Sequence, residues 1–351
     1  MCYVIIGPIL NPADLPGIKR LKDGGMKGLR VLIVMSLFLF TVPTVHALSA
    51  VASIKTMLGD VKIQRFQRFI PGRRGLVLND EDVVMTGQKA KATIIFRDGS
   101  EIRLFQNSNF TIEKSEEIQG KGKGFLKRFR LFSNKFKLST GSFWAKFTKG
   151  RQQTRISTPT ATCGIKGTVV AFSHRDDKLN VSLSIGEVEL ENEDEKITLS
   201  SGKMIQGITK RGTFKEKVKA LPYRLTIIPD SPKIEIPTVG NENQIFFTLQ
   251  LIDVKTMKNF ERSGDVYISM PLDKIVFPER IRLNKRGYSR LAAIVKPFQK
   301  ADYGLGQVEV LAMIEGQRFM NVGAGQTMLT YDIPKKSPRT IQIDATTGEV
   351  K

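Results

Sequence analysis

Short runs of alternating apolar and polar residues, most of them divided by a glycine, dominate the chain from residue 51 to about 210. Each run extends over roughly four to eight residues on either side of its glycine, which is the pattern of a strand, a turn and a second strand. The dividing glycines are Gly59, Gly87, Gly99, Gly141, Gly186 and Gly202. The pattern predicts an all-β region of stacked short strands, either β-solenoid-like or hairpin-based, without a strict sequence repeat.

A second series of short apolar runs follows between residues 224 and 336, again with frequent turn signals. Seven or so short strands in about 110 residues are typical of an immunoglobulin-like β-sandwich. The Cys…Trp…Cys spacing of antibody domains is absent, so this prediction rests on the strand pattern alone. The expected fold class is therefore all-β throughout, with the first region followed by a sandwich.

A Lys-rich connector over residues 213–223 separates the two regions, and the charge changes there. Residues 48–220 hold 32 basic and 18 acidic side chains, a net charge of +14, whereas 221–351 hold 18 and 14, a net charge of +4. We therefore expect a first domain over 48–212, a linker over 213–223, a sandwich domain over 224–336 and a tail over 337–351.

The first 47 residues predict an N-terminal extension and a signal peptide. Residues 31–42 form a short apolar run after Lys27 and Arg30. A membrane span needs about 20 such residues, whereas the apolar part of a signal peptide needs only about 7 to 15. Small residues at Val45 and Ala47 place cleavage after Ala47, so the signal peptide covers about 26–47 and translation starts at Met1 or at Met26. A retained anchor is the alternative, and either route predicts an exported chain, periplasmic or associated with the cell envelope.

The composition narrows the function classes. The chain carries 55 Lys and Arg against 34 Asp and Glu, a net charge of +21, which favours acidic partners. Two Cys and two His leave almost nothing for a zinc site, a disulfide framework or His-based catalysis. We therefore expect no catalytic residues, no metal and no cofactor.

A set of turn and strand motifs between residues 51 and 207 resembles FecR-like periplasmic domains. The motifs are Gly59-Asp60-Val61, the segment 82–87, Asp98-Gly99-Ser100, Thr158-Pro159, Lys166-Gly167-Thr168 and the strand closed by Gly186 and Val188. The namesake members of that family are transmembrane regulators whose cytoplasmic part holds a sigma factor. At most 30 residues precede the apolar run here, too few for a folded domain, so we do not expect an anti-sigma role. Lys166 stands where the family more often has Arg, and it lacks the planar fork that binds a carboxylate bidentately.

The same motif residues have a structural interpretation that needs no ligand. Asp98-Gly99 predicts a two-residue type I′ turn, because Asp and Gly tolerate positive φ. Pro159 lacks an N–H and is expected at a strand start or on an edge, and Gly167 is expected at a bend within a strand. All of these residues, with Ser100, Thr158, Lys166, Thr168 and Gly186, are expected to build the fold rather than a binding site.

Two clusters carry candidate chemistry that we weigh against simpler interpretations. Cys163 and His174 are the one thiol–imidazole pair of the mature chain, but Cys163 fits a small buried apolar position and His174 a loop. The acidic residues Glu187, Glu189, Glu191, Glu193, Asp194 and Glu195 could bind Ca²⁺, but their alternation with Val188 and Leu190 favours a solvated strand face.

The basic stretch from 118 to 155 carries eleven Lys or Arg and no acid. Its exposed first part supplies a candidate binding patch, Lys121, Lys123, Lys127, Arg128 and Arg130. The interleaved Phe136, Phe143 and Phe147 alternate as core residues would. In an exported protein such a patch would bind an acidic envelope polymer or an envelope protein, with membrane-surface contact as a further option and no nucleic acid. No pattern indicates an oligomeric state.

These observations favour an exported, non-enzymatic binding or scaffold protein of the cell envelope. The alternative is an envelope signal-transduction regulator related to the FecR family but without its cytoplasmic part. An envelope hydrolase is a distant third, because no Ser–His–Asp, paired-carboxylate or metal constellation stands out by its spacing.

Overall fold

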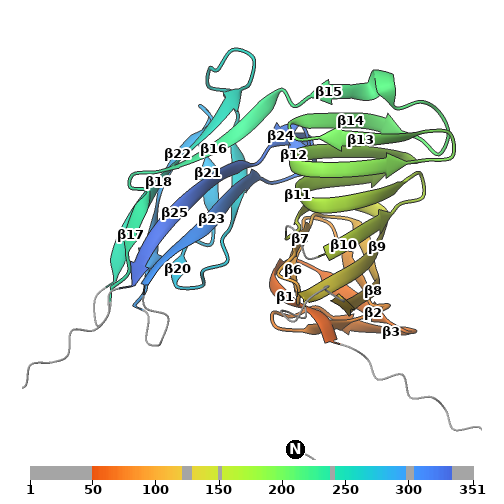
Figure 1. Ribbon diagram of the computed structural model, residues 1–351, viewed down its shortest axis with the longest axis horizontal. Coiled ribbons are helices and arrows are strands. Elements are labelled where there is room, and N and C mark those ends of the chain that lie inside the picture. The colour runs from red at the N-terminus through yellow and green to blue at the C-terminus, as the bar shows by residue number, and fades with distance from the viewer. Residues whose placement is uncertain (1–49, 121–128, 149–151, 238–241, 298–303, 334–351) are drawn as a thin grey trace, which may run out of the picture. The chain divides into compact units, whose positions relative to one another are not determined.

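Strands build almost the whole of the described chain (Figure 1), which confirms the predicted all-β fold class. The computed structural model describes residues 50–120, 129–148, 152–237, 242–297 and 304–333. They belong to one compact unit, Ser49–Lys351. The predicted signal peptide over 26–47, the rest of the N-terminal extension and the tail over 337–351 lie outside these residues. None of the described helices is long and apolar enough to span a membrane.

The first β region is a single sheet of fifteen strands. They are β1 (Ala50–Leu58), β2 (Val61–Arg65), β3 (Arg68–Pro71), β4 (Val77–Asn79), β5 (Val83–Thr86), β6 (Lys91–Phe96), β7 (Glu101–Leu104), β8 (Ser108–Gly120), β9 (Phe129–Lys146), β10 (Gln152–Ser157), β11 (Thr162–Arg175), β12 (Lys178–Glu191), β13 (Lys196–Ser200), β14 (Lys203–Ile208) and β15 (Val218–Ala220).

Antiparallel pairing of strands that follow one another in sequence dominates this sheet. Examples are β2–β3, β6–β7, β8–β9 and β11–β12. Among the residues described in this sheet, only β10 and β9 pair in parallel. Of the two forms that the sequence predicts, the hairpin-based one is therefore observed rather than the β-solenoid.

The long strand β9 changes partners at Gly141. Before this glycine β9 pairs with β8 and β10, and after it β9 pairs with β7 and β11. Gly141 has a φ of +100°, and a Cβ there would lie 2.3 Å from Ser108 Cα. The Ser108 hydroxyl donates to the Phe105 carbonyl at 2.8 Å and accepts from the Ser142 N–H at 3.0 Å. Only glycine allows the two backbones to approach this closely.

A register shift in the β8–β9 pairing between Leu138 and Thr140, just before Gly141, accompanies a change of parity along β9. Phe136 and Leu138 point into the core before the shift, and Phe143, Ala145 and Phe147 point into it afterwards. The predicted core positions of this stretch are confirmed. The rings form a continuous aromatic group in which Phe110 contacts Phe136 at 5.4 Å and Phe143 at 5.6 Å between centroids.

The C-terminal strands form two five-stranded sheets that enclose a second core. One sheet contains, in order, β20 (Ile275–Val276), β22 (Tyr288–Val295), β18 (Asn243–Asp253), β16 (Tyr223–Pro229) and β24 (Val322–Gly323). The other contains β17 (Lys233–Glu235), β25 (Gly325–Ile333), β23 (Gly304–Ile314), β19 (Gly264–Ser269) and β21 (Ile281–Leu283). An immunoglobulin-like sandwich stays a prediction for these strands.

The Lys-rich connector over 213–223 is ordered in the structure. It contains the 3₁₀ turn η1 (Lys215–Lys217) and strand β15, which pairs with β14 at the edge of the first sheet. Phe214 is fully buried in the first core. A second 3₁₀ turn, η2 (Gln317–Phe319), follows β23.

Candidate functional site

The predicted family motif around Lys166 forms a β-bulge between β11 and β12. The pairing register shifts between Lys166 and Val169, where Gly167 has a φ of +54°. A Cβ on Gly186 would lie 2.6 Å from the Gly167 carbonyl oxygen, so the two glycines meet across the strands. Thr168 is buried, and the Lys166 side chain is exposed opposite Glu187. These residues shape the strand pair and leave no hollow for a ligand between the two glycines.

The Asp98-Gly99-Ser100 motif closes the β6–β7 hairpin, but not as the predicted type I′ turn. Gly99 has a positive φ of +82°, whereas Asp98 does not, so the two-residue I′ geometry is wrong. Phe96 N–H donates to the Ser100 carbonyl at 2.9 Å, which leaves a three-residue loop with glycine in the left-handed position. The Asp98 carboxylate accepts from Ser100 N–H at 2.8 Å and from the Asn134 amide at 2.7 Å. The Asp98 side chain therefore links the turn to β9, while its backbone has no positive φ.

Thr158-Pro159 occupies the turn between β10 and β11. The Thr158 hydroxyl accepts from the Ala161 N–H at 3.0 Å, and the Thr158 N–H donates to the Ala161 carbonyl at 2.9 Å. Pro159 lies in this turn and not at a strand start or edge as expected. The missing N–H is harmless there, because the threonine side chain and backbone close the turn.

Cys163 and His174 both lie on β11, eleven positions apart, or more than about 30 Å along an extended strand. Cys163 is fully buried, and burial raises the pKa of its thiol far above the ordinary value. His174 is also buried, with Nδ1 3.0 Å from the Ser139 carbonyl oxygen, so its expected loop position is wrong. The turn between β11 and β12 is formed by Asp176 and Asp177, and His174 itself lies within β11. The two side chains cannot form a catalytic pair.

Cys163 should therefore be inert in the folded protein. In a Cys2→Ser background, we expect a chromogenic disulfide reagent to label Cys163 at least about a hundredfold more slowly in native buffer than in urea, because burial suppresses both access and the thiolate. The absorbance change over time measures this ratio. Rapid labelling of the native protein at neutral pH would contradict the buried position.

The acidic residues on and after β12 form ion pairs along a solvated surface. Glu189 and Glu191 both pair with Lys196, at 2.7 and 3.6 Å, and Glu193 pairs with Lys210 and Arg211. The hydrogen bond from Lys196 lowers the pKa of Glu189. Val188 and Leu190 are fully buried on the opposite face, as predicted. In the described part of the chain, no group of three or more His, Cys, Asp or Glu is placed to hold a metal.

The predicted basic patch lies almost entirely outside the described residues. This holds for Lys121, Lys123, Lys127 and Arg128. Arg130 belongs to β9, where its backbone pairs with Gln119 of β8. The patch stays a prediction.

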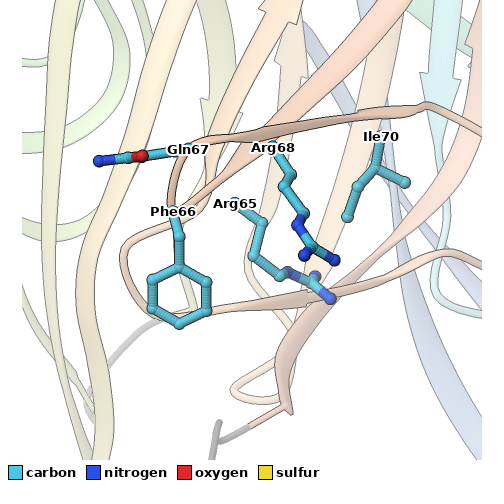
Figure 2. A pocket seen from close by; sticks show the side chains of 5 residues that line it. All are labelled: Arg65, Phe66, Gln67, Arg68 and Ile70. Atoms are coloured by element: carbon cyan, nitrogen blue, oxygen red, sulfur yellow. The ribbon is translucent and has the colours of Figure 1, made fainter.

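A different surface, at the β2–β3 hairpin, emerges from the structure. Phe66 and Gln67 form the two-residue turn, and Arg65 pairs directly with Arg68 across the strands. Phe66 is 67% exposed and Phe69 is 62% exposed. Figure 2 shows the side chains of Arg65 and Arg68 on the same side of the hairpin, with Gln67 pointing away from them. We call the residues Arg65–Phe69 together with Arg73 and Arg74 the hairpin surface.

A buried carboxylate fixes the base of the hairpin surface. Arg65 donates from Nε to Asp82 Oδ1 at 2.8 Å and from Nη2 to Asp82 Oδ2 at 2.7 Å. The same carboxylate accepts from Asn79 N–H at 2.9 Å. Asp82 therefore neutralises Arg65, which reduces the repulsion that two directly opposed cations would otherwise have. The charge of Arg68 is left available at the tip.

A hollow of about 600 Å³ lies beside this pair of arginines. Arg65, Phe66, Gln67, Arg68 and Ile70 line it (Figure 2). Guanidinium groups next to an aromatic ring and an aliphatic side chain suit an anionic group attached to an apolar one. Sequence reasoning missed this surface because Phe66 and Phe69 look like ordinary strand residues. The available signal was a segment, 61–79, with five cations and no acid.

The match with a known protein family begins after the β2–β3 hairpin. Residues 82–189 match the family described as FecR protein. Residues 82–189 form a FecR-family domain. The match contains the motifs around Asp98, Thr158, Lys166 and Gly186, and it is shorter at both ends than the expected span of 51–207.

We also compared the chain with curated proteins and with solved structures. No curated protein matches the chain. Seventeen chains of solved structures match it, among them two crystal structures of a "putative anti-sigma factor" from Parabacteroides distasonis ATCC 8503. Both share 13% identity, with TM-scores of 0.31 and 0.30, and cover 39% of this chain. The chain spans 59% of the length of those structures.

The FecR domain also supplies one side of a buried polar joint with the C-terminal strands. Glu315, at the end of β23, accepts from Lys91 and Arg103 of the FecR domain. Glu101 accepts from the Tyr267 hydroxyl and from the Ser269 hydroxyl, the latter at 2.7 Å. Burial and the Glu101 carboxylate raise the pKa of Tyr267, so its hydroxyl stays protonated and donates.

Apolar contacts surround this joint. A third cluster of buried residues joins the two regions: Phe105, Trp144, Val169, Leu311, Met313 and Ala324. The Arg103 guanidinium lies 4.1 Å from the centroid of the Tyr267 ring. The joint therefore combines charge pairs with packing.

Proposed function

We propose that this chain is an exported, non-enzymatic binding or scaffold protein of the cell envelope that acts through surface contacts. One observation carries the proposal: the hairpin surface exposes two phenylalanines beside three exposed arginines, Arg68, Arg73 and Arg74. Large exposed apolar side chains next to cations are typical of a contact surface. The ligand class is anionic, either an acidic envelope polymer, an anionic lipid surface or an acidic envelope protein.

The remaining chemistry supports binding rather than catalysis. Cys163 and His174, the candidate nucleophile and base, are buried at separate places on β11. The motif residues of the FecR domain form a bulge and two turns. Export, proposed from residues 26–47, places the hairpin surface where nucleic acid is absent and anionic envelope components are abundant.

Rebinding of the full chain to washed envelopes tests this function. We expect the chain to sediment with the envelopes and to be released as salt rises, since exposed charges are screened over about 8 Å at physiological salt. Replacement of Arg68, Arg73 and Arg74 by Gln should lower the salt concentration needed for release. A bound fraction that is the same for both proteins at every salt concentration would contradict a role of this surface.

A regulator related to the FecR family is the second candidate function, and the family match over 82–189 favours it. A regulator would pass on the state of a bound partner, whereas a scaffold would not. Deletion of the chain should then change the transcription of a defined gene set, measured by RNA sequencing. Unchanged transcription together with a changed envelope composition would favour the scaffold.

A further inference from the structure

We propose that the hairpin surface docks onto an anionic lipid bilayer, with Phe66 and Phe69 inserted among the head groups and the arginines bound to their phosphates. This inference rests on the proposed function, because it names the anionic component that the chain contacts. The occupant is the lipid surface itself and not a polymer or a folded protein.

The exposed phenylalanines lie on different sides of the hairpin, which favours a bilayer. Register pairs place Arg65 opposite Arg68 on one face and Gln64 opposite Phe69 on the other, while Phe66 is at the tip. A folded partner would cover one face and leave the second aromatic ring in water. A bilayer interface surrounds an inserted tip, so it removes both rings from water at once.

The charges around the tip complement anionic head groups. Segment 61–79 contains five cations, Lys62, Arg65, Arg68, Arg73 and Arg74, and no acid. Asp82 holds Arg65, and Asp60 lies 3.4 Å from Lys62, which leaves three exposed arginines at and after the tip. A guanidinium fork matches the oxygens of a phosphate and donates two hydrogen bonds to them.

The two-residue turn requires a positive φ at position 66, but it does not require a phenylalanine there. Phe66 has a φ of +54°, a left-handed conformation that bulky residues rarely adopt and that Gly or Asn would adopt more readily. Phe66 is 67% exposed and is not part of the first apolar core, so burial does not offset the cost of this conformation. A strained, exposed aromatic at a hairpin tip is the kind of outlier that points to a function outside the fold.

The position of β3 makes insertion sterically simple. In the described sheet β3 pairs with β2 alone, so the hairpin ends the sheet at that side. No described strand lies beyond it to hold the lipid surface away from the tip.

Tryptophan reporters test the two-sided contact. We would prepare Phe66→Trp and Phe69→Trp separately in the full chain recovered from the producing cell; the native Trp144 is buried and gives a constant background. Equimolar phosphatidylglycerol and phosphatidylcholine vesicles should shift the emission of both reporters to shorter wavelength, and pure phosphatidylcholine vesicles should not. A shift of neither reporter, or of one alone, overturns the proposal.

Two sets of variants test the energetic contributions. Phe66→Asn with Phe69→Thr should weaken vesicle binding at least about tenfold, and so should the triple change of Arg68, Arg73 and Arg74 to Gln, since each cation near the surface contributes about fivefold. The matched control for the phenylalanine changes is Met257→Asn. Met257 is also an exposed apolar residue, and it has a positive φ of +56°. The matched charge control changes Lys255, Lys285 and Arg286 of the sandwich to Gln. Both controls should bind vesicles as the parent does.

The outcomes separate this inference from the proposed function. Binding to washed envelopes but not to anionic vesicles would overturn the lipid inference and leave a polymer or protein as the anionic component. Loss of dextran sulfate binding in the arginine variant, with vesicle binding unchanged, would also overturn it. Phe66→Asn with Phe69→Thr changes two exposed side chains and should leave the melting temperature equal to that of the parent or higher, so a lost signal cannot be ascribed to unfolding.

Discussion

Replacing Gly141 by Ala should destabilise the first β region by at least about 3 kcal/mol, because two separate penalties coincide. The left-handed φ of +100° disfavours any side chain, and the new Cβ would lie 2.3 Å from Ser108 Cα. The backbone of β8 cannot move away without breaking the hydrogen bonds of the Ser108 hydroxyl to Phe105 and Ser142. Urea unfolding, followed by circular dichroism, measures the loss.

Gly202→Ala is the matched control for this change. Gly202 also has a positive φ, of +73°, but an added Cβ would meet nothing within 4 Å. Its cost should be about 1–2 kcal/mol, from the backbone conformation alone. Equal losses for both variants would show that the contact with Ser108 relaxes freely and that the change of partners along β9 does not depend on glycine at 141.

Replacing Glu315 by Ala should cost about 3–5 kcal/mol, because it leaves two partly buried cations without this carboxylate. The Glu315 side chain is 6% exposed, and those of Lys91 and Arg103 are 24% and 13% exposed. Glu309→Ala is the control, since Glu309 pairs with Lys146 at 2.8 Å but is more exposed, and its removal should cost at most about 1 kcal/mol.

The shape of the unfolding curve of Glu315→Ala carries further information. The sequence predicts two domains, 48–212 and 224–336, and the structure has one apolar core in each region with the joint between them. If the joint couples the two regions, calorimetry should give one transition for the parent and two for the variant. Two transitions already in the parent would mean that the joint contributes little to cooperativity.

Local patterns in the sequence predicted the elements of this fold. Alternation and glycine turns indicated the strands, since side chains alternate between the two faces of a strand and glycine permits the turn conformations. The buried Phe136, Leu138, Phe143 and Ala145, and the solvated acids on β12, follow from the same alternation. Features that depend on residues distant in sequence, such as the type of a turn, were harder to predict. The Asp98-Gly99 turn is a three-residue loop, and its Asp98 carboxylate accepts from Asn134, thirty-six residues away, a contact that no local pattern indicates.

Some sites depend on contacts that no local pattern reveals. His174 is buried because β9 covers it, and its loop-like neighbours gave no sign of this. The hairpin surface was equally hidden, since a phenylalanine in an alternating run is normally a core residue. Only the position of β3 at the end of the sheet shows that Phe66 and Phe69 are left in water.

By itself, the sequence determined the all-β class, the family of residues 82–189 and most of the core-facing positions, because each of these depends on residues a few positions apart. The tertiary structure alone decided the change of partners along β9, the hairpin surface and the joint. Lys91 and Glu315 are 224 residues apart along the chain, and Glu101 and Tyr267 are 166 apart. Such pairs bring together residues of both regions, where burial makes an unpaired charge costly, so no local pattern in the sequence reveals them.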